Sequence, residues 1–177
     1  MPNHQQTLRL GAARRVAVTG LLGALALTLS LLEGMLPPVP TLPPGAKLGL
    51  SNIAVLFAVQ SLGLLPALGI ALVKAVFAGL TRGGIAFLMS LSGGLLSTVL
   101  VFILSRLRRP RFGLLGLGIA GALAHNFGQL LTATLLTSLA AAWYAPWLIG
   151  FGVLFGAVTG VIPVSYTHLT LPTTSRV

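Results

Sequence analysis

The side chains in this sequence that could do chemistry are few, and several of them interrupt long apolar runs. Lys74 stands inside one run, and His125, Asn126 and Gln129 stand inside another. His125 and Gln129 are four residues apart, so they share a face if the segment is helical. Ionisable and amide groups are costly to bury among apolar side chains, and each of these four is therefore a candidate for ligand binding.

The sequence lacks the residues that most enzyme sites require. It contains no Cys, and Glu33 is its single acidic residue. This composition excludes thiolate chemistry and paired carboxylates, and no Walker loop, H-E-x-x-H or G-x-S-x-G motif is present. We therefore predict a protein that is not an enzyme and that has no catalytic residues, no metal site and no cofactor.

The composition indicates that lipid surrounds most of the chain. Of the 177 residues, 55% are hydrophobic and 7% are charged, whereas a soluble domain has ~25% charged residues. The formal net charge is +10, but the basic residues stand between apolar runs, as the positive-inside rule requires, so we reject nucleic-acid binding. The predicted fold class is an all-α integral membrane protein that crosses the cell membrane several times.

Six apolar runs predict a compact bundle of about six transmembrane helices, which forms a membrane domain over residues 16–163. The first run is too long for a signal peptide, so we expect it to be retained. Residues 1–15 form a basic N-terminus. The expected helices cover Val16–Leu36, Leu48 to about Leu64, Pro66–Leu80, Ile85–Ser105, about Leu114 to Ala140, and from near Pro146 to Pro163.

The polar stretch at residues 164–177 does not continue the apolar pattern. It resembles the translation of a transposon-type sequencing adaptor, and we expect it to be a non-native tail. A short native polar tail is the alternative. We assign no function to its residues.

Basic residues set the expected orientation. Six helices with a cytoplasmic N-terminus place the basic residues of segments 9–15 and 106–111 together in the cytoplasm. Lys47, Arg82 and the aromatic cluster at residues 143–147 then lie on the outer side. One helix more or fewer before residue 106 would separate the two basic segments.

Helix depth predicts that the polar side chains meet in a cavity that opens outward. Lys74 and His125 lie ~12 and ~17 Å from the cytoplasmic ends of their helices. Glu33 lies nearer the outer surface, where it could pair with Arg82 or Lys47. Because cations far outnumber the one acid, this cavity favours an anionic small molecule. The predicted substrate-binding residues are Lys74, His125, Asn126, Gln129, Asn52, Lys47, Glu33 and Arg82.

These residues also have structural interpretations. Lys74 could extend its amine to a membrane interface. His125 and Asn126 could simply hydrogen-bond neighbouring helices, and Glu33 could be a structural counter-ion.

Small residues at four-residue spacing mark close helix contacts, because lipid-embedded helices associate through backbone approach. The helices expected at residues 66–80, 114–140 and 146–163 carry such stripes, and most are expected to pack inside the bundle. The stripe on the first helix is expected instead to dock a partner subunit. Its residues are Ala13, Ala17, Gly20 and Ala24.

Three segments resemble a known family: PGAKLGLSNI at residues 44–53, SLSGGLLS at 90–97 and GALAHNFGQ at 121–129. They are similar to the Gx transporter family, often labelled heptaprenyl diphosphate synthase component I, over most of residues 16–163. That family resembles the S components of energy-coupling-factor transporters, which are small six-helix proteins with an outward substrate cavity. The resemblance implies docking, through small residues of the first helix, on a transmembrane scaffold subunit driven by two ATPases.

Two functional hypotheses remain open from the sequence. One is a membrane substrate-binding subunit of a small-molecule uptake transporter, energised by partner ATPase subunits. The other is a membrane accessory subunit of polyprenyl (heptaprenyl) diphosphate synthesis. In that case another protein must catalyse, because a single Glu cannot hold the Mg²⁺ ions that bind a diphosphate. A purely structural membrane component is a third hypothesis.

Overall fold

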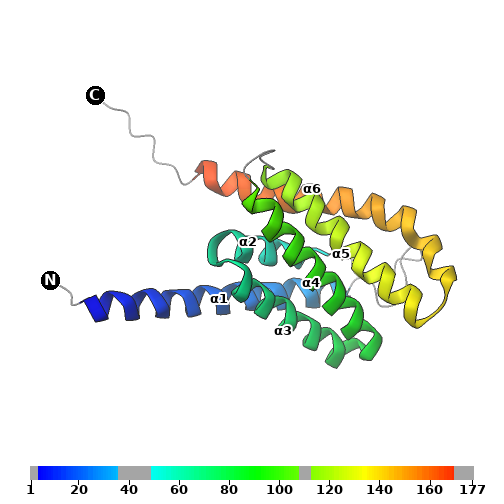
Figure 1. The fold of residues 1–177 in the computed structure, drawn as a ribbon, viewed down its shortest axis with the longest axis horizontal. Helices are drawn as coiled ribbons and strands as arrows, with labels where there is room; N and C mark the ends of the chain where they lie inside the picture. Colours follow the sequence, from blue (N-terminus) through cyan, green and yellow to red (C-terminus); the bar gives the residue numbers. More distant parts are fainter. Residues whose placement is uncertain (1–3, 36–48, 108–112, 170–177) are drawn as a thin grey trace.

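The computed structural model describes residues 4–35, 49–107 and 113–169, with side chains described at 11–35, 49–107 and 113–161. Over these residues the fold is an all-α bundle (Figure 1). A 3₁₀ helix, η1, joins its last two α-helices. The elements are α1 (His4–Met35), α2 (Asn52–Leu62), α3 (Leu64–Arg82), α4 (Gly84–Arg106), α5 (Leu114–Leu136), η1 (Leu139–Tyr144) and α6 (Ala145–Leu169).

Five segments are long and apolar enough to cross a membrane, which confirms the prediction of a multi-pass membrane protein. They are Gly11–Met35, Leu64–Arg82, Gly84–Arg106, Leu114–Leu136 and Leu139–Val161. Helix α2 differs from the expected second span, because it has 11 residues. At ~1.5 Å per residue it is ~16 Å long, about half of a ~30 Å hydrocarbon layer.

The short helix α2 occupies the centre of the bundle, where it contacts α1, α3, α4, α5 and α6. Its buried residues Ala54, Val55, Ala58 and Val59 pack in one apolar cluster with residues of α1 and α3. Its middle residues, Ile53–Val59, are all apolar, which suits a position surrounded by other helices. The long helices therefore surround a half-length central helix.

All six α-helices, the short α2 included, alternate in direction along the chain, so that α1, α3 and α5 run one way and α2, α4 and α6 run the other (Figure 1). Helices α3 to α6 pack as successive neighbours. The start of α1, the end of α4 and the end of α6 consequently lie at one end of the bundle, and Arg82 lies at the other. Arg14, Arg15 and Arg106 share an end, as the positive-inside argument predicts.

Three expected boundaries are corrected by the structure. Helix α1 begins at His4 rather than Val16, because good helix formers extend it beyond the apolar run. Helix α5 ends at Leu136, and η1 follows where a continuous helix to Ala140 was expected. Helix α6 continues past Pro163 to Leu169. Whether residues 164–177 are native stays a prediction.

Glycines bring α5 and α6 into backbone contact. A Cβ placed on Gly156 would lie 2.6 Å from the Cα of Ile119, and one on Gly160 would lie 2.5 Å from the Cα of Leu115. These separations are shorter than carbon–carbon contact permits. The stripe on α6 therefore packs internally, as does that on α3, where Ala67, Ala71 and Ala75 are buried.

We predict that Gly156→Ala destabilises the bundle by ~1–3 kcal/mol, since the added methyl must push α5 away. Gly150→Ala is the matched control, because its Cβ would meet nothing within 4 Å. The control should be neutral or stabilising by up to ~1 kcal/mol, the helix-propensity gain of Ala over Gly. Thermal unfolding in detergent, followed by tryptophan fluorescence, measures both. Equal midpoints for the two variants would contradict the close α5–α6 contact.

Candidate functional site

A cluster of buried polar side chains lies at mid-bundle, toward the end that carries Arg82. Lys74 and Gln129 are each 2% exposed, and His125 is 4% exposed. They contribute to one cavity whose lining comes from five helices or their adjoining turns. The residues that line it are Ser30, Ser51, Lys74, Arg82, Ser90, His125 and Gln129.

Lys74 is fixed by a buried hydrogen bond, in which its Nζ donates to Oδ1 of Asn52 over 2.7 Å. The two residues face one another because each is eleven positions from Gly63, the turn between α2 and α3. Gly63 has a φ of 93°, a conformation that glycine adopts without strain. The tight turn thereby sets the register that pairs the amide with the ammonium group.

Glu33 fastens the end of α1 to the start of α2. Its Oε1 accepts hydrogen bonds from the backbone N–H of Gly49 at 2.6 Å and of Leu50 at 2.7 Å. The Asn52–Lys74 contact places the start of α2 level with a residue eight positions before Arg82, or ~12 Å from the C-terminal end of α3. Backbone N–H groups outside a helix need hydrogen-bond acceptors from the protein at such depth, because lipid offers none. The carboxylate of Glu33 is the acceptor for Gly49 and Leu50.

The pairing expected for Glu33 was with Arg82 or Lys47. Glu33 is close enough to Arg82 for their charges to interact, and its Oε1 accepts hydrogen bonds from two backbone amides. Lys47 lies outside the described residues. The carboxylate also sits at the N-terminal end of α2, where the helix dipole favours a negative charge.

His125 packs against Gly93 of α4, in space that a side chain at that position would fill. A Cβ on Gly93 would lie 2.8 Å from Nδ1 of His125 and 2.7 Å from its backbone oxygen. Gly93 in turn meets Gly128, whose Cβ would lie 2.7 Å from the Cα of Gly93. Beside this crossing, the hydroxyls of Ser92 and Thr132 are 2.6 Å apart. The close α4–α5 approach positions His125 and Gln129 in the cavity.

Asn126 faces a different helix from its neighbour His125. Its Nδ2 donates to the backbone oxygen of Leu148 over 2.7 Å, which joins α5 to α6. It does not line the polar cavity. The structure thus places Asn126 at a helix–helix contact, one of the two interpretations that its sequence position allowed.

The structure brings most of the predicted site residues together. Lys74, Arg82, His125 and Gln129 line the cavity, Asn52 is bonded to Lys74, and Glu33 lies at the adjoining turn. The three serines of the lining, Ser30, Ser51 and Ser90, were not predicted as site residues. Ser30 precedes Glu33 by one helical turn and Ser51 precedes Asn52, so proximity to predicted residues was the available signal.

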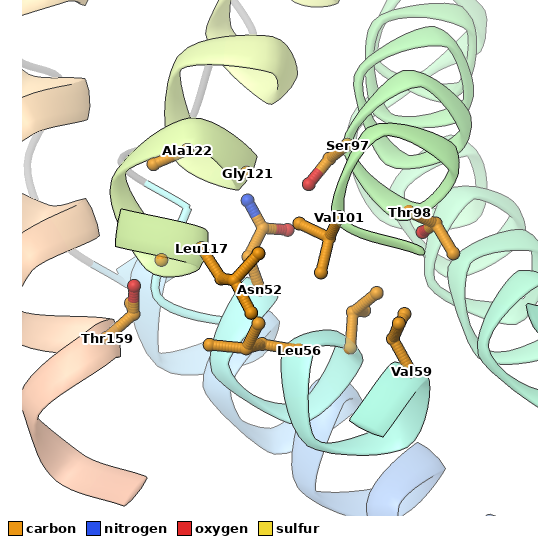
Figure 2. A pocket seen from close by; sticks show the side chains of 12 residues that line it. Asn52, Leu56, Val59, Ser97, Thr98, Val101, Leu117, Gly121, Ala122 and Thr159 are labelled. Carbon is orange, nitrogen blue, oxygen red and sulfur yellow. The ribbon is translucent and has the colours of Figure 1, made fainter. Parts of the chain in front are cut away.

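A second cavity lies on the side of Asn52 that faces away from Arg82 (Figure 2). Val55, Val59, Val101 and Leu117 contribute apolar walls, and Ser97, Thr98 and Thr159 contribute hydroxyls. In Figure 2 the Asn52 side chain points between α4 and α5. Asn52 therefore stands between the polar cavity and this mainly apolar one.

The chemistry available in the polar cavity is that of anion recognition. Lys74 and Arg82 supply positive charge, and Gln129 and three serines supply hydrogen-bond donors. No cluster of three or more metal-ligating His, Asp or Glu side chains occurs in the part of the chain that is described. In this structure the cavity has room for little more than a water molecule, so a larger ligand requires it to widen.

Comparison with known proteins finds one family. The sequence model of the family described as heptaprenyl diphosphate synthase component I matches residues 22–165. No curated protein and no solved structure matches the chain. The matched range contains the polar cavity and all six α-helices in whole or in part.

We predict that Glu33→Ala destabilises the protein by ~1–3 kcal/mol for each backbone amide left without its acceptor. Glu33→Gln should cost less, because its carbonyl oxygen can still accept the two hydrogen bonds. Leu32→Ala, at a neighbouring half-exposed position, is the control for a shortened side chain on α1. Thermal unfolding in detergent ranks the three variants. A Glu33→Ala protein as stable as Leu32→Ala would contradict the role of Glu33 at the α2 start.

Proposed function

The chain belongs to the heptaprenyl diphosphate synthase component I family, and we propose from the polar cavity what it does. We propose that it is a membrane subunit that captures a small anionic molecule. The polar cavity is its binding site. The subunit acts with partner proteins, because the sequence carries no nucleotide-hydrolysing motif. On this proposal it serves small-molecule uptake and receives energy from partner ATPase subunits through a membrane scaffold.

The observation that carries the proposal is that two cationic side chains, buried Lys74 and half-buried Arg82, line one cavity in a chain with one acidic residue. Charged side chains inside a membrane protein are rare and usually serve function. The carboxylate of Glu33, the one acidic side chain, also accepts hydrogen bonds from two backbone amides. A ligand carboxylate or phosphate would add the negative charge that the lining favours.

Each side chain has a distinct part in the proposed binding. Lys74 contributes charge from α3, and Asn52 holds its amine in place from α2. Arg82 contributes a guanidinium from the outer end of α3, where a planar fork suits a carboxylate or phosphate. Gln129 and Ser90 reach the cavity from α5 and α4, and their donors would orient the ligand.

The small-residue stripe on α1 remains the expected partner contact. Ala13, Ala17, Gly20 and Ala24 are all exposed, and a Cβ on Gly20 would meet nothing within 4 Å. The stripes on α3 and α6 are instead occupied by neighbouring helices. A membrane scaffold subunit could approach α1 closely along this stripe.

The family description favours a second candidate, an accessory role in heptaprenyl diphosphate synthesis. The single acidic residue means that a partner would have to hold the metal ions and catalyse. Purification from membranes with identification of bound proteins separates the two candidates. ATPase and scaffold subunits support uptake, whereas a soluble prenyl-transferring enzyme supports the accessory role and contradicts our proposal.

We predict that a carboxylate or phosphate compound raises the unfolding temperature of the purified protein in a panel of vitamins, metals and anions. Lys74→Met should weaken its binding by about thirtyfold or more, the usual effect of truncating one partner of a buried charge pair. Val73→Met changes the adjacent, lipid-exposed position and should bind as the wild type does. If no anion stabilises the wild type, the proposed site is wrong.

Gln129→Glu provides a second variant of nearly unchanged size. Its added carboxylate would pair with the cavity cations and compete with the ligand, so anion affinity should fall further than for Gln129→Met. Isothermal titration calorimetry in detergent gives both affinities. Stronger anion binding by Gln129→Glu would exclude an anion-selective cavity.

A further inference from the structure

Helix α1 continues beyond the part of the bundle that covers it. Ser30 lies at the polar cavity with Lys74, and Arg15 precedes it by fifteen residues, or ~23 Å along the helix. The α2–α3 turn at Gly63 is eleven residues from Lys74, or ~16 Å. The arginine therefore lies beyond that turn, and Figure 1 shows α1 running past it.

A groove opens where α1 passes the end of α2. Its lining from α1 is Gly11, Ala12, Arg14, Arg15 and Val18, and its lining from α2 is Ser61 and Leu62. Both arginines are three or four residues from Gly11 and from Val18, so these four residues share a face of α1. This face continues the one that is buried at Ala26, Ser30 and Glu33. It is roughly opposite the stripe of Ala13, Ala17, Gly20 and Ala24.

The positive charge of this groove has no counter-charge from an acidic side chain. Glu33, the single acidic residue, is eighteen positions after Arg15, or ~27 Å away along a continuous helix. The groove lies at the same end of the bundle as Arg106, which is sixteen residues and ~24 Å from the cavity residue Ser90. This is the level expected for the cytoplasmic lipid headgroups.

We propose that the groove binds one anionic phospholipid of the cytoplasmic leaflet. The lipid phosphate lies against Arg14 and Arg15, and its glycerol and first methylenes lie against Val18 and Leu62. A phospholipid fits because the groove carries two arginines beside the apolar side chains of Val18 and Leu62, and because it lies at headgroup depth. The lipid fills the space beneath the short α2 and anchors α1 to the bundle. This inference does not depend on the proposed ligand of the polar cavity.

The test is native mass spectrometry of the full chain released from nanodiscs of equal phosphatidylglycerol and phosphatidylcholine. The wild type should retain one phosphatidylglycerol. Arg14→Gln with Arg15→Gln should lower that retention relative to phosphatidylcholine by more than about tenfold, since each basic residue near a membrane surface contributes roughly fivefold. Ala12→Phe, which fills the groove without changing charge, should give a similar loss.

Arg106→Gln is the matched control, because it removes one charge at the same end of the bundle but outside the groove. It should retain the lipid. Equal loss in Arg106→Gln would show diffuse attraction only and overturn the proposal. So would equal retention of phosphatidylcholine, or displacement of the lipid by millimolar glycerol 3-phosphate, which would indicate a site for a soluble phosphate. Retention unaffected by Ala12→Phe would likewise exclude the groove.

Discussion

Backbone amides that lie at membrane depth must find partners inside the protein, and the arrangement of this bundle follows from how Gly49 and Leu50 do so. The carboxylate of Glu33 accepts both hydrogen bonds, which permits α2 to begin within the bundle rather than at its outer surface. A half-length α2 then brings Asn52 level with Lys74. The hydrogen bond between them, at 2.7 Å, fixes the lower boundary of the polar cavity.

Close helix contacts complete the cavity from the other side. Gly93 and Gly128 let α4 and α5 approach so closely that a methyl group on either would overlap the other helix. Lipid provides no hydrophobic force to press helices together, so such contacts and interhelical hydrogen bonds carry the packing. His125 lies directly against this crossing. The same contact therefore holds two helices and orients the imidazole, and the site is inseparable from the fold.

The sequence predicts the cavity better than it predicts the elements around it. Helical rise is constant, so counting residues places Lys74 and His125 within ~5 Å of one another in depth. The structure brings both, together with Gln129, to one cavity. The length of α2 was not predictable in this way. The run from Leu48 to Leu64 contains no charged residue and no proline, so nothing in it marks where the helix starts. That start depends on a contact of Gly49 and Leu50 with Glu33, sixteen or more residues earlier. The sequence predicted an ion pair of Glu33 with Arg82 or Lys47, because opposite charges attract. It did not predict the hydrogen bonds that Glu33 accepts from the backbone amides of Gly49 and Leu50.

The polar cavity, with Lys74 and Arg82, and the groove, with Arg14 and Arg15, differ in the kind of anion that can neutralise their positive charge. Lys74 and Arg82 line a cavity inside the bundle, so an anion that enters it must lose bound water. The free-energy cost of this dehydration is offset only if hydrogen-bond donors of the protein replace the water. The serines and Gln129 in the lining provide such donors. Arg14 and Arg15 remain exposed at the end of the bundle, where a headgroup can approach without complete dehydration and salt screens the attraction. On the two proposals, the buried cavity would select an anion by shape, whereas the exposed groove would select a lipid by charge and by contact with its acyl chains.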